Sequence, residues 1–219
     1  EKVLVYGDYD VDGTTSVAMM YSFLKKKVKE IEYYIPCRYD EGYGISLKGI
    51  DYAKDNNFAL IIALDCGIRA VNQVDYANEK GVDFIICDHH NPGEKVPEAL
   101  AILNPKQIDC NYPYKELSGC GVGFKLIQAF SKQNNIDFSE IMEYLDLLTV
   151  SIGADIVPMT GENRVFSFYG LQQINKTPRV GLKALMEIAN KTKDVTITDV
   201  VFGVAPRINA AGRIEHAKK

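Results

Sequence analysis

The sequence predicts an α/β fold: a parallel sheet of about five strands with helices on both faces, followed by a helical C-terminal portion. Short, continuous apolar runs rich in Val and Ile recur in the first half of the chain, which is typical of strands buried on both sides. Helical patterns of ten or more residues separate them, as in βαβ units. The expected strands are 3–6, 31–35, 59–64, 84–87 and 99–103.

Helices dominate the expected structure after Pro113. Apolar residues at helical spacing predict helices over 121–132, 139–151, 163–175 and 181–191, in addition to an early helix over about 14–28. No Gly/Ser linker separates the two halves. We therefore expect the helical portion to form a layer or subdomain attached to the sheet.

Composition narrows the class of protein. The 219 residues are 47% hydrophobic, and no apolar run approaches the roughly 20 residues of a membrane span. The start does not resemble a signal peptide, and the five cysteines form no CxxC pair, so we expect reduced thiols in a cytoplasm. With a net charge of −4, a nucleic-acid partner would need a local basic surface or another domain.

Polar residues gather where three predicted strands end. Asp8, Asp10 and Asp12 follow the first strand, Asp65 follows the third, and the triplet 88–90 (Asp-His-His) follows the fourth. In a parallel sheet these ends meet at one edge, where ligands bind. Crowded carboxylates and imidazoles are costly unless cations lie among them. Oxygen ligands with imidazoles suit Mn²⁺ or Mg²⁺.

Each element of this pattern has a simpler explanation by itself. The DxDxDG run also occurs in calcium loops, but Met19 stands where an EF-hand would have its bidentate Glu. A single Asp after a strand, such as Asp65, is commonly a helix cap, and adjacent histidines are commonly surface residues. The combination at one sheet edge is what predicts a metal site.

These motifs resemble those of the DHH phosphoesterase superfamily, and two of them resemble its RecJ branch, the single-strand-specific 5′→3′ DNA exonucleases. The superfamily motifs are 7–13 (Gly-Asp-Tyr-Asp-Val-Asp-Gly), Asp65, 88–90 and 154–158 (Ala-Asp-Ile-Val-Pro). The motifs of the branch are 41–44 (Glu-Gly-Tyr-Gly) and 206–213 (Pro-Arg-Ile-Asn-Ala-Ala-Gly-Arg).

The resemblance implies a site with two Mn²⁺ or Mg²⁺ ions. Asp10 and Asp12 would hold one ion each, and Asp65 would bridge them as a catalytic ligand. His89 and Asp155 would complete the shell of the second ion. A water between two such ions becomes a nucleophile for in-line attack on a phosphodiester.

The remaining polar residues of the motifs are expected at the ions or directly beside them. Asp88 is a further expected metal ligand, and Asp8 is expected to be a ligand or a hydrogen-bond acceptor behind the ligands. We place His90 beside the scissile phosphate, or in the outer shell, as a catalytic residue. The manganese pyrophosphatases of the superfamily have a His four residues before the first paired Asp, where this chain has Tyr6.

Substrate contacts are expected from basic and amide side chains near the motifs. Arg207, Asn209 and Arg213 suit phosphate oxygens, although the two Arg residues would equally suit ion pairs that fix a domain edge. Arg38 is a further candidate for a phosphate contact. Tyr43 is expected either to stack on a base or to pack within its loop.

The implied function is metal-dependent hydrolysis of single-stranded DNA from its 5′ end, in DNA repair and recombination. A single-strand-binding protein and a helicase are candidate partners. Two alternatives remain: a phosphodiesterase of short oligoribonucleotides or cyclic dinucleotides, and a catalytically silent scaffold.

The expected domain organisation also follows from the resemblance. Residues 1–205 would form the catalytic domain, with a sheet part over 1–112 and a mostly helical part over 113–205. Residues 206–219 would begin a connector to a DHH-associated domain that this sequence does not contain. A fragment of this kind is expected to bind metal but to have weak nuclease activity.

Overall fold

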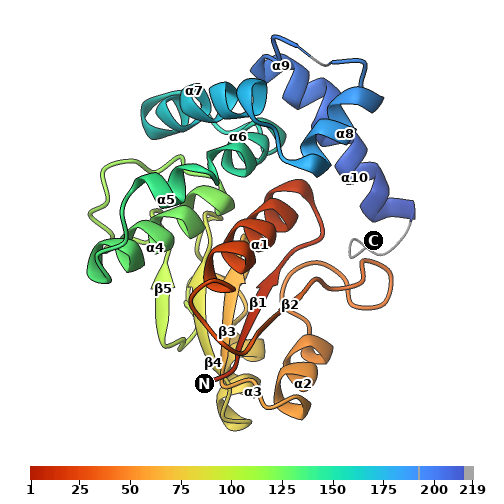
Figure 1. The fold of residues 1–219 in the computed structure, drawn as a ribbon. Coiled ribbons are helices and arrows are strands. Elements are labelled where there is room, and N and C mark those ends of the chain that lie inside the picture. Colours follow the sequence, from red (N-terminus) through yellow and green to blue (C-terminus); the bar gives the residue numbers. More distant parts are fainter. Residues whose placement is uncertain (192, 215–219) are drawn as a thin grey trace.

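The computed structural model describes residues 1–191 and 193–214, with side chains described up to Ala211. Five strands form one parallel sheet in the order β2-β1-β3-β4-β5 (Figure 1). The strands are β1 Val3–Gly7, β2 Ile31–Tyr34, β3 Leu60–Leu64, β4 Asp83–Cys87 and β5 Ala101–Leu103. The predicted fold class is confirmed.

Helices cover both faces of the sheet, because alternate strand residues point to opposite sides. Val3 and Val5 pack in the core beneath α1 and α4, whereas Leu4 and Tyr6 pack in the core beneath α2 and α3. The four helices are α1 Val11–Leu24, α2 Leu47–Asp55, α3 Val71–Glu79 and α4 Gly119–Gln133. The continuous apolar strands of the sequence are thus explained by burial on both faces.

Helix α1 begins three residues earlier than the sequence pattern predicts. The carboxylate of Asp10 accepts a hydrogen bond from the backbone N–H of Gly13 and caps the helix. The first turn of α1 therefore lies inside the acidic motif 7–13. This places Asp12 on the helix itself, at the edge of the sheet.

The second half of the described chain is helical, as predicted, and packs on α1 and α4 (Figure 1). Its elements are α5 Ser139–Met142, α6 Leu145–Ala154, α7 Gly161–Lys176, α8 Val180–Ile188, α9 Ile197–Asp199, the π-helix η1 Val200–Val204 and α10 Ala205–Ile214. No described helix has both the length and the apolar character needed to cross a bilayer.

The structure divides the single helix expected over 139–151 into α5 and α6. The guanidinium of Arg179 donates to the carbonyl oxygen of Glu143 at 2.6 Å and pairs with the buried carboxylate of Asp146 at 2.8 Å. The break is thus stabilised by a side chain distant in sequence, which apolar periodicity does not reveal. The pattern also does not predict α9, η1 and α10, which form a separate apolar cluster with Val11 and Val150.

Helices α6 and α7 pack closely together at Gly170. A Cβ atom there would lie 1.9 Å from Thr149 Oγ1 and 2.2 Å from the Leu145 carbonyl oxygen. We expect Gly170→Ala to lower the free energy of unfolding by about 1–3 kcal/mol, the usual cost of overpacking, as measured by urea denaturation. Gly181→Ala in α8 is the matched control, because nothing lies within 4 Å of its added Cβ. Equal stability of the two variants would contradict the close packing.

Candidate metal centre

The acidic residues lie at the point where the strand order reverses. From β1 the chain moves to one side to form β2, and it then returns to the other side of β1 to form β3. Ligands of open parallel sheets bind outside the carboxyl ends of strands at such a point. Asp8 follows β1, Asp65 follows β3 and Asp88 follows β4, as the sequence predicts.

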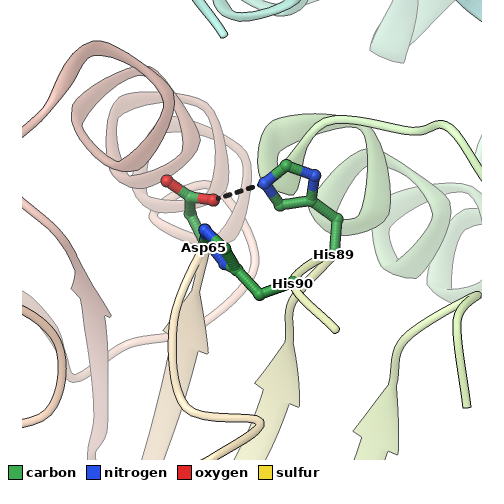
Figure 2. Close-up of side chains that lie close together, drawn as sticks. All are labelled: Asp65, His89 and His90. Carbon is green, nitrogen blue, oxygen red and sulfur yellow. Dashed lines mark ion pairs between the residues drawn. The ribbon is translucent and has the colours of Figure 1, made fainter. Parts of the chain in front are cut away.

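His89 is at the centre of the acidic residues. Its Nε2 atom lies 3.2 Å from Asp65 Oδ1 (Figure 2). It also lies 3.6 Å from Asp155 Oδ2 and 3.9 Å from Asp12 Oδ2. The imidazole is buried, yet neither of its nitrogens forms a hydrogen bond with any described residue, and neither does Asp65 Oδ1. Unpaired buried polar atoms are costly. Their convergence fits a site for cations.

Two overlapping sets of side chains have the geometry of metal ligands. Asp65, His89 and His90 form one set, and Asp12, His89 and Asp155 form the other. Within each set, one candidate ligand atom per residue lies within 4.8 Å of the others. The structure therefore brings Asp155, from the end of α6, to the sheet edge. The donor set of carboxylates and imidazoles fits Mn²⁺ or Mg²⁺.

Asp65 is held in an uncommon backbone conformation. Its φ angle is 61°, in the left-handed region that Asp tolerates better than most residues. The first residue of α4, Gly119, approaches it so closely that an added Cβ would lie 2.4 Å from Asp65 Oδ1. Glycine at 119 is therefore required for the carboxylate of Asp65 to occupy this position.

Asp12 is tied to two helices of the second half. Its carboxylate accepts hydrogen bonds from the backbone N–H groups of Gly119 and Cys120, at 2.7 and 2.8 Å, and from the Ser151 hydroxyl at 2.8 Å. Helix N-termini favour such negative charge. Sequence reasoning did not identify these three residues. The signal that would have indicated them is Ser118, a helix cap followed by a glycine-rich first turn.

Asp8 contacts the loop that contains the 41–44 motif. It accepts hydrogen bonds from the N–H groups of Tyr9 and Gly44, at 2.7 and 2.8 Å. The carboxylate of Glu41 fixes the same loop by accepting from the Cys37 N–H and the Ser46 hydroxyl. The motif thus has a structural explanation: its glutamate closes the loop and its last glycine binds Asp8.

Asp88 organises the Asp-His-His loop. One carboxylate oxygen accepts from the N–H groups of His89 and His90 and lies 2.7 Å from His90 Nδ1, while the other accepts from the Ile68 N–H. Burial would raise the pKa of Asp88, but the bonds to His90 and Ile68 lower it overall. Its oxygens are thus occupied by protein donors, and its role as a metal ligand stays a prediction.

Asp8, Asp10, Asp65 and Asp155 are harder to ionise. Burial, followed by repulsion from Asp12 and Asp10, raises the pKa of Asp155 to about 7 and that of Asp65 well above its ordinary value. Burial likewise raises the pKa of Asp8 to about 6 and raises that of Asp10. Burial lowers the pKa of His89, which favours the neutral imidazole that binds metal. Divalent cations would relieve this accumulation of negative charge.

Of the expected substrate residues, Tyr43 contacts the ring of His90. It is 55% exposed and its ring meets those of His90 and Tyr9 edge-on. The Arg38 guanidinium lies 5.2 Å from the centroid of the Tyr9 ring. Beside His90 is a hollow of about 430 Å³ that Tyr43 and Arg69 also line.

The residues expected from the 206–213 motif lie on α10, which packs against α6 and α1. Arg207 donates to the carbonyl oxygen of Gly203, one turn earlier along the chain, and Asn209 is half-buried on the same helix. The described residues show no hydrogen bond or ion pair between either of them and the acidic centre. The side chain of Arg213 lies outside the described residues. Their roles in substrate binding stay predictions.

The chain matches a known protein family and several of its members. The model of the DHH family, N-terminal domain, matches residues 2–152. The chain belongs to the DHH family. The single-stranded-DNA-specific exonuclease RecJ of Bacillus subtilis is 43% identical over 219 residues, and that of Escherichia coli is 36% identical over 226. These alignments cover 99% and 98% of this chain, but only 27% and 39% of the relatives.

Solved structures extend the likeness of this DHH domain to metal-bound proteins. A crystal structure of exonuclease RecJ bound to manganese has a TM-score of 0.88 at 33% identity and covers 99% of this chain and 54% of that one. RecJ from Thermus thermophilus in complex with Mn²⁺ has a TM-score of 0.84 at 31% identity, with coverage of 99% and 31%. The chain thus resembles the N-terminal core of RecJ.

We expect Asp65→Asn to have opposite effects with and without metal. Without metal the variant removes a repelled charge, so its melting temperature should rise by about 2–4 °C, the shift that 1 kcal/mol produces in a domain of this size. Free Mn²⁺ at 100 times its Kd should stabilise the wild type by about 2.7 kcal/mol and the variant far less.

Thermal unfolding in EDTA and in Mn²⁺ measures both effects. Asp75→Asn on α3 is the control, because this exposed carboxylate lies outside both ligand sets. It should change neither value. A variant at position 65 that loses stability in EDTA and keeps its full response to Mn²⁺ would contradict the proposed site.

Proposed function

We propose that this DHH domain is the catalytic core of a RecJ-like exonuclease that hydrolyses phosphodiester bonds of single-stranded DNA from the 5′ end. The observation that carries the proposal is the buried imidazole of His89, which lies among the carboxylates of Asp12, Asp65 and Asp155 without a hydrogen bond from the described residues. The similar proteins of B. subtilis and E. coli are named single-stranded-DNA-specific exonucleases, and two similar structures contain manganese, which supports the proposal.

In this proposal His89 and the three carboxylates around it, together with Asp10, hold two Mn²⁺ or Mg²⁺ ions. Bound there, the ions would supply an activated water and offset the negative charge of the phosphate. Asp88 would orient His90 through Nδ1, which leaves Nε2 for a second contact. His90 is the more exposed histidine of the pair, with 43% of its side chain accessible, so it would meet either an ion or the scissile phosphate.

In this proposal the nucleophile is a water molecule and not a side chain of the protein. Cys66 and Cys120 are the thiols beside the centre, and burial raises the pKa of each well above its ordinary value. Both therefore remain protonated and weakly nucleophilic. We therefore propose that water, and no side chain, attacks the phosphodiester.

Substrate selection would depend on the loop of Tyr43 and Arg38. An exposed aromatic ring and a guanidinium suit the bases and phosphates of an unpaired strand. The hollow beside His90 also has the volume of a small-molecule site, which keeps a short oligoribonucleotide or a cyclic dinucleotide as the second candidate substrate. A single-strand-binding protein and a helicase remain predicted partners. The cytoplasm is the proposed compartment, since all five cysteines are unpaired.

Degradation of end-labelled strands by the full-length protein tests the proposal. With Mn²⁺ we expect mononucleotides to be released first from the 5′ end of a single strand, with little attack on duplex, short RNA or cyclic dinucleotide. His89→Ala should lose more than the roughly 10–100-fold typical of residues behind a metal ligand, whereas Asp75→Asn should retain activity. Unchanged activity of His89→Ala, or preferred turnover of a small nucleotide, would overturn this function.

Residues 1–219 alone should behave differently from the full-length protein. We expect them to bind Mn²⁺, because both candidate ligand sets lie within them, but to cleave single strands slowly. Calorimetry with Mn²⁺ and specific activity on the same strand measure the two properties. Equal specific activity of the two proteins would show that residues outside 1–219 contribute little to substrate binding.

A further inference from the structure

The segment that follows β5 lies beside the Asp-His-His loop. Leu103 is paired with Cys87 in the parallel register, and its carbonyl oxygen accepts a hydrogen bond from the Asp88 N–H at 3.0 Å. Residues just after β5 therefore reach the same edge of the sheet as the acidic centre. Sequence reasoning assigned no role to this segment.

Asn104 locks the backbone of this segment to the loop of the two histidines. The amide nitrogen of its side chain donates to the His90 carbonyl oxygen at 2.9 Å, and its side-chain oxygen accepts from the Lys106 N–H at 2.8 Å. Asn104 is only 3% exposed, and Pro105 between the two residues is buried. The start of the Lys106 side chain thus has a defined position relative to His90.

Lys106 is half-buried on the segment that Asn104 fixes to the loop of the two histidines. Its charge opposes the rise in the pKa of Asp155 and contributes to the lowered pKa of His89. Within the part of the chain that the structure describes, no carboxylate lies within ion-pair distance of it. Lys80 and Lys125, in contrast, pair with Asp51 and Glu162. A half-buried lysine near several acids, but paired with none, is available to an external anion.

We propose that Lys106 forms a phosphate subsite beside the Asp-His-His loop, in which its ammonium binds a non-bridging oxygen of the substrate backbone. The inference rests on the proposed function, because it requires a phosphodiester substrate.

The sheet topology gives this subsite a place along the strand. Arg38 follows β2 and Lys106 follows β5, and these are the two edge strands of the sheet. The centre lies between them, at the ends of β1, β3 and β4. A strand bound across the centre would meet Arg38 toward one edge and Lys106 toward the other. Lys106 would therefore bind a different phosphate from Arg38.

Lys106→Gln in the full-length protein tests the subsite. Loss of a hydrogen bond to a charged group predicts a fall in kcat/KM on single-stranded DNA of about 10- to 100-fold. The slope of log kcat/KM against log salt should become less negative by about 0.7, the value for one phosphate contact to a single strand. Lys106→Arg should retain most activity. Lys95→Gln is the charge-matched control on the exposed segment before β5, and it should change neither quantity.

Neutral methylphosphonates placed at single positions near the cleaved bond identify the phosphate that is bound. At one position the methylphosphonate should lower the kcat/KM of the wild type about as much as Lys106→Gln does. At that position it should not lower the kcat/KM of Lys106→Gln any further. Independent effects at every position, or an unchanged salt slope, would overturn the subsite alone. A wild-type protein that leaves single strands intact would overturn the proposed function and the subsite together.

Discussion

The carboxylate of Asp12 joins three parts of the molecule at the centre. It lies in the first turn of α1 and accepts two N–H groups from the start of α4 and a hydroxyl from Ser151 of α6. Hydrogen bonds to a charged group contribute about 1.5–3 kcal/mol each, whereas burying an unpaired carboxylate costs several kcal/mol. The three bonds together allow Asp12 to be buried. Because α6 also carries Asp155, the same bonds bring that residue to the sheet.

Among the described residues, no comparable set of hydrogen-bond donors contacts the carboxylate of Asp65 beside His89. The N–H groups of Gly13, Gly44 and Gly119 already bind Asp10, Asp8 and Asp12. Among the described residues, Asp65 Oδ1 and both nitrogens of His89 have no hydrogen-bond partner. Each such atom costs about 1–3 kcal/mol, a large share of the roughly 5–15 kcal/mol that stabilises a typical domain. The domain thus gives up stability for a site that cations complete, and the apolar cores on both faces of the sheet offset this loss.

Much of this arrangement could be predicted from the sequence, because each strand is recognised from its own run of apolar residues. Ligands of parallel sheets bind outside the carboxyl ends of the strands, so the residues that follow each strand indicate the site. These two rules placed Asp8, Asp65 and His89 at one edge without a structure. Contacts between distant segments could not be obtained in this way. The break before α6 depends on Arg179, and the position of Lys106 depends on the side chain of Asn104. Asp155 was expected only through the family resemblance, since nothing in its neighbours indicates that α6 ends at the sheet.

Tyr6 lies on β1 and holds the loop that contains the 41–44 motif. The manganese pyrophosphatases of the superfamily have a histidine at the corresponding position, but here the Tyr6 hydroxyl donates to the Gly44 carbonyl oxygen and accepts from the Ser46 N–H. Its ring stacks on Tyr34, and burial raises its pKa, so it remains a neutral hydrogen-bonding group. The residue therefore fixes the loop that presents Tyr43 beside His90. In the proposed enzyme, Tyr6 thus holds the loop that would meet the DNA strand.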